Sequence, residues 1–407
     1  MKPLRFCMVT TFYPPYHFGG DAIFVRGLSR VLTAQGHSVE VVHCEDAYRL
    51  RGQPPVDQKP PDDKIIVHRL HSRLGALSPL ITQQTGRPGV KHAALRRILD
   101  QPFDVIHFHN ISLIGGPHVL TMGHAPVKLY TLHEHWLVCP MHVLWKNGKQ
   151  ACDKPQCIRC CLRSGTPPQL WRYTGMVNRC LRQVDALLSP SEFTAQRHRE
   201  GGIVCPIHVL PTFATIRAPA HSDAALSSRP HFVFVGRMKL SKGVLELAEQ
   251  FRMLPQYDLT IAGEGELLEV LRHDFADCAH IRLLGDVPPE RVTQLFQQAT
   301  AVIFPFVGPE VFPLVVLEAM ACGAPVIVRE AGGSAEAVHA TGGGVVYRTS
   351  DELRQAVQRM AEDQAWRDSL ASKALIGHQQ RYTAEVHMAE YHRLIQAIQL
   401  SKKSQAC

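Results

Sequence analysis

The sequence predicts an α/β protein made of two doubly wound domains that face each other across a cleft. The first observation is a strand–helix–strand unit within the first 45 residues, and the second is a new α/β series that starts after a linker. The third is that apolar runs of strand length alternate with amphipathic segments along nearly the whole chain. Such alternation indicates parallel sheets with helices on their faces. With 407 residues, the chain is long enough for two hydrophobic cores.

The first domain is predicted at residues 1–218 and begins with the strand–helix–strand unit. Residues 4–12, "LRFCMVTTF", form an apolar run of strand type, and residues 21–35 have apolar side chains at helical spacing. Gly36 then stands where a helix C-cap is expected. The further strands of this domain are predicted at residues 37–45, 64–70, 104–110, 127–135, 185–191 and 206–212.

The second domain is predicted at residues 219–385. An Ala-, Ser- and Pro-rich stretch at residues 217–230 is interpreted as the interdomain linker. The strands that follow are predicted at 231–238, 257–265, 280–287, 300–306, 324–330 and 342–348, with amphipathic segments at 243–252 and 289–299. The last helix, in residues 386–407, is expected to pack back on the first domain. Ligand sites in doubly wound sheets lie at the carboxyl ends of the strands.

Composition favours a cytoplasmic globular protein. Hydrophobic residues make up 45% of the chain and charged residues 20%, and no run of 18 apolar residues predicts a membrane-spanning helix. The N-terminus lacks the apolar core and cleavage site of a signal peptide. We therefore expect the twelve cysteines to be reduced thiols or metal ligands.

Positive charge is concentrated in the first half of the sequence. Residues 1–220 carry 26 Lys and Arg against 14 Asp and Glu, whereas residues 221–407 carry 18 against 22. This half is expected to meet a phospholipid surface, a phosphorylated acceptor or nucleic acid, with an ordinary solvated surface as the alternative. The segment 64–100 is interpreted either as a docking surface for an anionic membrane or lipid-linked acceptor, or as a plain basic helix face. It includes the basic residues Arg69, Arg73, Arg87, Lys91, Arg96 and Arg97.

Two glutamates stand on either side of a short apolar run in "GPEVFPLVVLEAMACGAPVI", residues 308–327. A buried strand is predicted to end near Phe306, and Pro313 fits the first turn of a helix that ends at a glycine. Glu310 then precedes the helix, and Glu318 lies about a turn and a half inside it. The free N–H groups of the first turn suit a diphosphate, and a carboxylate on each side suits vicinal hydroxyls. The pattern therefore predicts a site for a nucleotide sugar.

These residues, together with "VGRMKLSKG", "IAGEGE" and "GGDAIFVRGL", resemble the retaining family-4 glycosyltransferases of the two-Rossmann (GT-B) class. The motifs follow the family's order along nearly the whole chain. The resemblance implies transfer of a sugar from a nucleotide-diphosphate sugar to a glycan or lipid-linked acceptor, with retained anomeric configuration and no cofactor required for catalysis. It also implies a role in bacterial surface polysaccharide or glycolipid synthesis, in the cytoplasm or peripherally at the inner membrane face.

The resemblance assigns roles to individual residues. Glu318 would hold the ribose hydroxyls, and Glu310 would hold the donor sugar. Arg237 and Lys242 would neutralise the diphosphate leaving group, and His133 would contact the donor sugar near the reacting carbon. The other implied donor-binding residues are Gly19, Gly20, Gly263, Gly265, Val311, Phe312, Pro313 and Leu314. Gly19 and Gly20 open a helix, so they are expected to touch phosphate or the acceptor.

Three polar residues near His133 have plainer interpretations. His107 and His109 end the neighbouring predicted strand, where histidines are more often structural. Glu134 is either a base toward an acceptor hydroxyl or a local salt-bridge partner.

A cysteine-rich insert at about residues 139–165 predicts a structural zinc site. Cys139, Cys152, Cys157 and Cys160 could supply four thiolates, which would leave no open position for catalysis. Redox-active or simply buried thiols are the alternatives.

Two other functions remain as alternatives at this point. A nucleotide-sugar epimerase or hydrolase would use the same fold, but the pair of glutamates with Arg237 and Lys242 disfavours it. A zinc-stapled nucleic-acid-binding protein is disfavoured because no basic stripe interleaved with aromatic residues stands beside the cysteines. No nucleic-acid partner is therefore expected.

Overall fold

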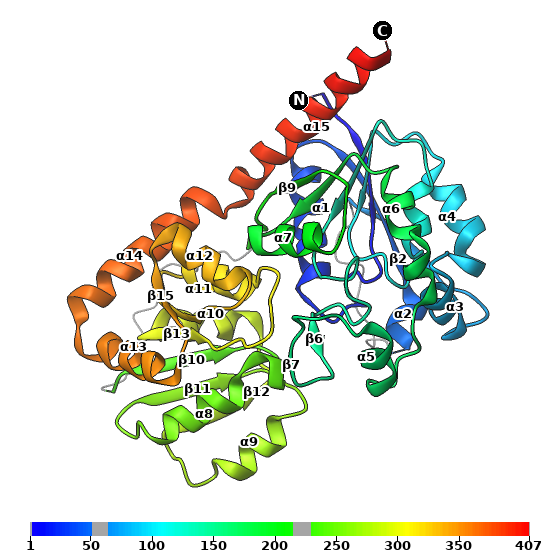
Figure 1. The fold of residues 1–407 in the computed structure, drawn as a ribbon. Helices are drawn as coiled ribbons and strands as arrows, with labels where there is room; N and C mark the ends of the chain where they lie inside the picture. The colour runs from blue at the N-terminus through cyan, green and yellow to red at the C-terminus, as the bar shows by residue number, and fades with distance from the viewer. Residues whose placement is uncertain (1, 51–63, 215–228, 407) are drawn as a thin grey trace. The chain divides into compact units, whose positions relative to one another are not determined.

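A computed structural model describes residues 2–50, 64–214 and 229–406 (Figure 1). The chain divides into two compact units. Unit 1 comprises Met1–His142, Gln156–Pro211 and His387–Cys407, and unit 2 comprises Val143–Pro155 and Thr212–Val386. Most of the predicted linker, residues 217–228, lies outside the described residues.

Unit 1 is built on a parallel sheet with the strand order β3-β2-β1-β4-β5-β8-β9 in the described residues. The strands are β1 (Arg5–Val9), β2 (Ser38–Cys44), β3 (Ile66–Leu70), β4 (Val105–Phe108), β5 (Val127–Thr131), β8 (Ala186–Ser189) and β9 (Ile207–Val209). Phe6 of β1 pairs with Val39 on one side and Val105 on the other. The chain therefore reverses its direction of strand addition between β1 and β4, where such sheets open a crevice.

Along the chain, helices alternate with the strands of the unit 1 sheet. They are α1 (Gly20–Ala34), α2 (Glu45–Arg49), α3 (Leu77–Thr85), α4 (His92–Leu99), α5 (Cys157–Arg163), α6 (Met176–Leu181) and α7 (Glu192–Glu200), with short 3-10 turns at Gly89–Lys91, Pro117–Thr121 and Leu170–Thr174. The last helix, α15 (Ala384–Ala406), joins this unit from His387 onward. Its Tyr391 hydroxyl lies 2.9 Å from Nδ1 of His107, a buried residue of β4. Lys402 Nζ pairs with Asp185 Oδ1 at 2.6 Å.

Unit 2 contains a second parallel sheet, with the order β12-β11-β10-β13-β14-β15. This is the strand order of a Rossmann fold, with its switch point between β10 and β13. The strands are β10 (His231–Val235), β11 (Asp258–Ala262), β12 (Ile281–Gly285), β13 (Ala301–Phe304), β14 (Val326–Arg329) and β15 (Gly344–Tyr347). The predicted fold class is thus confirmed.

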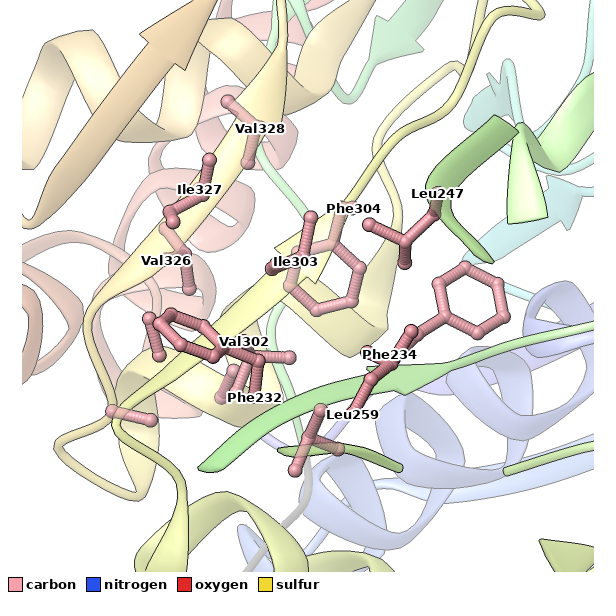
Figure 2. Close-up of a cluster of buried hydrophobic side chains, with 14 of the residues drawn as sticks. Phe232, Phe234, Leu247, Leu259, Val302, Ile303, Phe304, Val326, Ile327 and Val328 are labelled. Carbon is pink, nitrogen blue, oxygen red and sulfur yellow. The ribbon is translucent and has the colours of Figure 1, made fainter. Parts of the chain in front are cut away.

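The unit 2 core forms because its strands are apolar on both faces. Phe232, Phe234, Leu259, Ile303 and Ile327 are fully buried between the sheet and its helices (Figure 2). Continuous apolar strands are typical of parallel sheets covered on both sides. The helices are α8 (Val244–Arg252), α9 (Leu268–Asp274), α10 (Pro289–Gln298), α11 (Leu314–Ala321), α12 (Gly333–Thr341), α13 (Ser350–Glu362) and α14 (Gln364–Arg381), with a 3-10 turn at Leu240–Lys242.

The cysteine-rich insert does not stay with one unit. Residues Val143–Pro155 carry a hairpin, β6 (Trp145–Lys146) and β7 (Gln150–Ala151), that belongs to unit 2, although the sequence placed the whole insert in the first domain. Asn147 and Gly148 turn this hairpin with φ of 54° and 71°. The physical reason for the difference is Trp145, whose ring packs beside Gly308 of unit 2.

Candidate functional site

Loops from four adjacent strands of unit 2 meet at the carboxyl edge of its sheet. The loop after β10 bonds to the loop after β11 through Met238 N–H, which donates to Glu264 O at 2.7 Å. The loop after β13 bonds back through Gly308 N–H to Ser241 O at 2.9 Å. It also receives the start of α12, because Gly333 N–H donates to Glu310 O at 2.8 Å. These backbone bonds hold the predicted donor-binding segments together.

Gly263 and Gly265 have a packing role at this edge. Their φ angles are 129° and 151°, a region that residues with a Cβ rarely adopt. A Cβ on Gly263 would lie 2.0 Å from Gly236 O, and one on Gly265 would lie 2.4 Å from Met238 O. Both glycines are therefore needed for the close approach of the two loops.

Lys242 and Glu310 form an ion pair in this group of loops. Lys242 Nζ lies 2.8 Å from Glu310 Oε1, and both side chains are largely buried. The Lys242 ammonium also lies 4.3 Å from the centre of the Phe306 ring, a distance typical of a cation–π contact. Arg237 is exposed at the end of β10. The structure therefore brings Lys242, predicted to bind the diphosphate, into direct contact with Glu310, predicted to bind the sugar.

Helix α11 begins one residue later than predicted. Pro313 has extended backbone angles and is the N-cap, so Val311 and Phe312 precede the helix and Leu314 is its first residue. Proline can occupy either position. Its φ suits both, and the N–H group that it lacks would have no partner within the helix at either one. Of the N–H groups predicted for the first turn, only that of Leu314 belongs to the helix.

Glu318 lies in the second turn of α11 among apolar side chains. Its neighbours Leu317 and Ala319 are fully buried, and Glu318 itself is only partly exposed. Burial disfavours the charged carboxylate and raises the pKa of Glu318 to about 7. A glutamate kept in such surroundings is a candidate for ligand binding.

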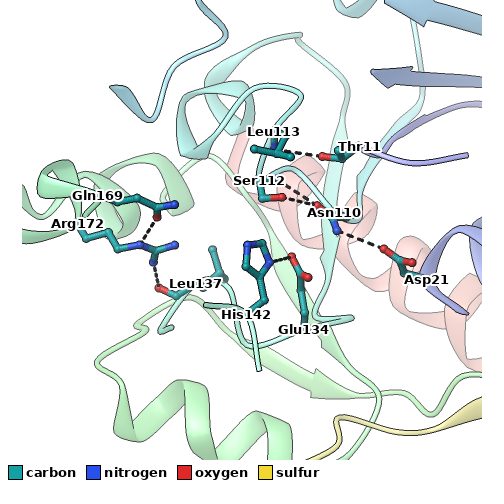
Figure 3. A network of polar contacts seen from close by, with 10 residues as sticks. All are labelled: Thr11, Asp21, Asn110, Ser112, Leu113, Glu134, Leu137, His142, Gln169 and Arg172. Carbon is teal, nitrogen blue, oxygen red and sulfur yellow. Dashed lines mark hydrogen bonds and ion pairs between the residues drawn. The ribbon is translucent and has the colours of Figure 1, made fainter. Parts of the chain in front are cut away.

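In unit 1, the predicted glycine loop is tied to the loop after β4. Gly19 is the N-cap of α1 and Gly20 its first residue. Asp21, in the first turn, accepts a hydrogen bond from Asn110 Nδ2 at 3.2 Å (Figure 3). Asn110 Oδ1 in turn accepts from Ser112 Oγ at 2.8 Å. The network fixes the start of α1 beside the loop that follows β4.

His133 stands just after β5 and is only partly exposed. Its Nε2 lies 3.0 Å from Nδ1 of His109, and the edge of the Phe24 ring packs against it. Burial lowers the pKa of His133 to about 4, although the Asp21 carboxylate acts in the opposite direction. Glu134 lies 2.8 Å from His142 Nδ1, the contact expected of a local partner (Figure 3).

Cys139, Cys157 and Cys161 of the insert lie near Arg172, and no metal centre forms in the described residues. No group of three or more His, Cys, Asp or Glu side chains is placed there to hold a metal ion. Cys139, Cys157 and Cys160 belong to unit 1 and Cys152 to unit 2. Arg172 donates to Leu137 O at 3.2 Å and to Gln169 Oε1 at 2.6 Å, as Figure 3 shows. The zinc site stays a prediction that metal analysis of the purified protein would test.

Several residues at these sites were not anticipated from the sequence. Phe306 and Trp145 are aromatic residues beside the loop that carries Glu310. Asp21 and Asn110 link α1 to the loop after β4. Their positions follow from loop conformations, and the sequence carries only the weak signal that polar or aromatic residues follow strand ends.

Two doubly wound units with carboxylates and cations at a strand-end edge define a protein of the nucleotide-binding α/β class. Residues 18–216 match the family described as glycosyltransferase family 4, and residues 229–363 match glycosyl transferases group 1. Together the two matches cover most of the chain. The chain therefore belongs to the family-4 glycosyltransferases of the GT-B class, and the resemblance found in its motifs is confirmed.

Individual relatives support this membership. The O-antigen biosynthesis glycosyltransferase WbnH of Escherichia coli is 30% identical over 132 residues, which cover 32% of this chain and 37% of that protein. Sucrose-phosphate synthase (tll1590) of Thermosynechococcus elongatus has a TM-score of 0.76 at 19% identity, over 98% of this chain and 100% of that chain. Anabaena Alr3699/HepE, solved in complex with UDP-glucose, has a TM-score of 0.68 at 16% identity, over 97% and 100%. The two structures show the shared fold.

Among the residues that the structure describes, none of the helices combines the length and apolarity required to span a membrane.

Proposed function

We propose that this glycosyltransferase uses a nucleotide-diphosphate sugar, held at the strand-end edge of unit 2. The supporting observation is that Glu310 and Glu318 lie on either side of the start of α11, with Lys242 bonded to Glu310 at 2.8 Å. Glu318 accepts hydrogen bonds from the ribose hydroxyls, and Glu310 accepts them from the sugar. Lys242 and Arg237 neutralise the diphosphate. The UDP-glucose complex of the structurally similar HepE supports a donor of this class.

The ion pair between Lys242 and Glu310 would change when the donor binds. A diphosphate carries more negative charge than one carboxylate, so the ammonium is expected to turn toward it. Glu310 would then be released to bind sugar hydroxyls. Donor binding would thus replace the ion pair, with Lys242 bound to the diphosphate and Glu310 bound to the sugar.

We propose a retaining, front-face displacement. The bond between the anomeric carbon and the diphosphate oxygen breaks as the acceptor oxygen bonds to the same face. The acceptor proton passes to the departing phosphate oxygen. Positioning and charge stabilisation by the protein supply the catalysis. NMR of the product anomeric proton tests this step, and a product of inverted configuration would rule it out.

The experiment that tests the proposed function is release of nucleoside diphosphate. UDP-, GDP- and ADP-sugars are supplied one at a time, with and without candidate acceptors. We expect release from one donor class to depend on an acceptor. Equal release without any acceptor would favour the hydrolase alternative, and interconversion of the donor sugar without release would favour the epimerase.

Metal-independent catalysis gives a separate prediction. Because Lys242 and Arg237 are cations at the proposed diphosphate position, EDTA should leave the transfer rate within about twofold of its untreated value. Initial rates with EDTA and with added Mg²⁺ measure this. A loss of activity that only Mg²⁺ restores would contradict the role assigned to the two side chains.

The proposed acceptor is a glycan or lipid-linked glycan of a bacterial surface polysaccharide or glycolipid. WbnH, which acts in O-antigen biosynthesis, supports this class. Polymers and lipid-linked intermediates of this type carry phosphate, which suits the basic first half of the chain. A cytoplasmic location, peripheral at the inner membrane face, follows from such an acceptor.

The segment 64–100 supports membrane attachment with one correction. Lys91 is buried and donates to Ser78 Oγ and Thr82 Oγ1, both at 2.9 Å, so it cannot contact a membrane. The five arginines of this segment are exposed: Arg69, Arg73, Arg87, Arg96 and Arg97. Leu74, Leu77 and Val90 are exposed beside them in the sequence. Exposed apolar and basic side chains together favour an anionic lipid surface.

Charge reversal of Arg96 and Arg97 should weaken binding to vesicles that contain phosphatidylglycerol by at least about tenfold, since each basic residue contributes about 1 kcal/mol near such a surface. Vesicle flotation at low and high salt measures the effect. A matched control reverses Lys373 and Arg381, which are exposed on α14 of unit 2. Equal binding of the wild-type protein to neutral and anionic vesicles would refute membrane docking by charge.

A further inference from the structure

His109 is a buried residue in direct contact with His133. Its backbone N–H donates to Val9 O at 2.9 Å, which fixes its position at the end of β4. Its Nδ1 lies 3.0 Å from Nε2 of His133 at the end of the neighbouring strand β5. The two rings lie nearly parallel, with centres 5.2 Å apart. From the sequence alone, His109 is interpreted as a structural residue, and it has no role in the reaction proposed above.

Both rings of this pair are neutral near pH 7. Burial, with further repulsion from other histidines, lowers the pKa of His109 well below its usual value, and burial lowers that of His133 to about 4. A neutral imidazole carries one proton, on either nitrogen. One ring therefore donates the hydrogen bond and the other accepts it, and the choice fixes the tautomer of both.

The surroundings of His109 decide which ring donates. Its Nε2 is buried and has no hydrogen-bond partner among the described residues. The adjacent His107 ring cannot serve, because its Nδ1 is bonded to Tyr391 Oη at 2.9 Å and its Nε2 to Thr131 Oγ1 at 2.8 Å. A buried N–H without a partner is rarer and less favourable than a buried lone pair. The proton of His109 therefore belongs on Nδ1, not on Nε2.

We propose that His109 is a positioning residue that holds His133 as the tautomer protonated on Nδ1. His109 donates from Nδ1 to Nε2 of His133, so the single proton of His133 must lie on its own Nδ1. His133 then offers a hydrogen-bond donor, which suits an oxygen of the donor sugar. This last step rests on the proposed function, whereas the tautomer itself does not.

The tautomer can be measured on the full-length protein without any substrate. Nitrogen chemical shifts of ¹⁵N-histidine-labelled protein distinguish protonated from bare ring nitrogens, and the spectrum of His133→Gln assigns the signal of His133. We expect His133 to be protonated at Nδ1 in the wild-type chain. In His109→Phe, which keeps a ring but loses the donor, we expect a mixture of tautomers.

Kinetics then tests the consequence for transfer. His109→Phe should lower kcat/KM about tenfold or more, the size expected for loss of one oriented hydrogen bond. His109→Asn, whose amide can donate from a similar position, should restore much of the loss. Tyr391→Phe is the matched control. It removes one buried hydroxyl from the same stack of rings and should lower stability without changing the tautomer of His133.

The outcomes separate the two proposals. A wild-type His133 protonated at Nε2 would overturn the positioning role whatever the activity. The same holds for a His109→Phe protein that folds, keeps the wild-type tautomer and transfers sugar at the wild-type rate. If the expected tautomers are found in a protein that transfers no sugar from any donor, the positioning stands and the proposed function fails.

Discussion

Replacing Glu318 with glutamine should abolish the thermal stabilisation that a nucleotide-diphosphate sugar gives to the wild-type protein. A carboxylate can accept hydrogen bonds from both ribose hydroxyls, whereas an amide offers one acceptor oxygen and two N–H groups. The side chain stays in place because α11 is held by its buried neighbours Leu317 and Ala319. Thermal shift against UDP-, GDP- and ADP-sugars measures the loss, since ligand binding raises the melting temperature by mass action.

The same substitution should make the ligand-free protein more stable above pH 7. The pKa of Glu318 is about 7 in the folded protein, against 4.5 for an unperturbed glutamate. The folded state thus holds a proton that the unfolded state loses first, and folding stability falls as pH rises from 4.5 to 7. Glutamine has no charge to bury, so Glu318→Gln should gain roughly 1–3 kcal/mol at pH 8 and almost nothing at pH 4.

Urea unfolding at the two pH values measures this gain. Glu249→Gln is the matched control, because Glu249 is an exposed glutamate on α8 of the same unit. It should change neither stability nor donor binding. A Glu318→Gln protein that still responds to the donor as the wild type does would refute the ribose assignment. Lower stability at pH 8 would show that the carboxylate is not strained by burial. Loss of the donor response together with a gain in stability at pH 8 would indicate that Glu318 is kept for binding at a cost in stability.

The strands and their order of appearance could be predicted from the sequence, because buried parallel strands are continuous apolar runs. "HFVFV" and "AVIF" become β10 and β13, and neither needs information from elsewhere in the chain. Glu318 could also be singled out, since a carboxylate inside an apolar helix is unusual, and Glu310 by its place just before the same helix. Loop geometry could not. The ion pair of Glu310 with Lys242 depends on contacts between loops far apart in sequence.

The cysteine-rich insert shows the same limit from another side. The spacing of Cys139, Cys152, Cys157 and Cys160 fits a metal site, but spacing does not determine how a long insert folds. The hairpin that carries Cys152 belongs to unit 2, where Trp145 packs against the loop of Gly308. A tryptophan ring offers a large apolar area for such packing. That preference is invisible in a count of the residues between cysteines.

Replacing Lys242 with methionine should lower kcat at least about a hundredfold, because removing one preorganised group that stabilises transition-state charge has effects of this size. Methionine is an unbranched apolar side chain one atom shorter than lysine, so the substitution removes the ammonium, with its contact to the Phe306 ring, and keeps most of the aliphatic stem. Glu310 is then left as an uncompensated carboxylate beside the proposed diphosphate position and repels it. Donor affinity should therefore fall together with the rate. Lys239→Met, which removes an exposed lysine from the same loop, should stay within about twofold of the wild type.

A double-mutant cycle separates the two causes of this loss. If Glu310 serves only to hold Lys242, then Lys242→Met combined with Glu310→Gln should be no slower than Lys242→Met alone, because the repulsive carboxylate is gone. If Glu310 also binds the sugar, as we propose, the double variant should have a lower kcat than Lys242→Met, because the sugar has then lost its carboxylate acceptor as well. Measuring kcat and the donor dissociation constant for the four proteins distinguishes the cases. A Lys242→Met protein with wild-type kcat would show that the ammonium does not face the leaving group. In that case the ion pair of Lys242 with Glu310 would be a structural contact between the loops that follow β10 and β13.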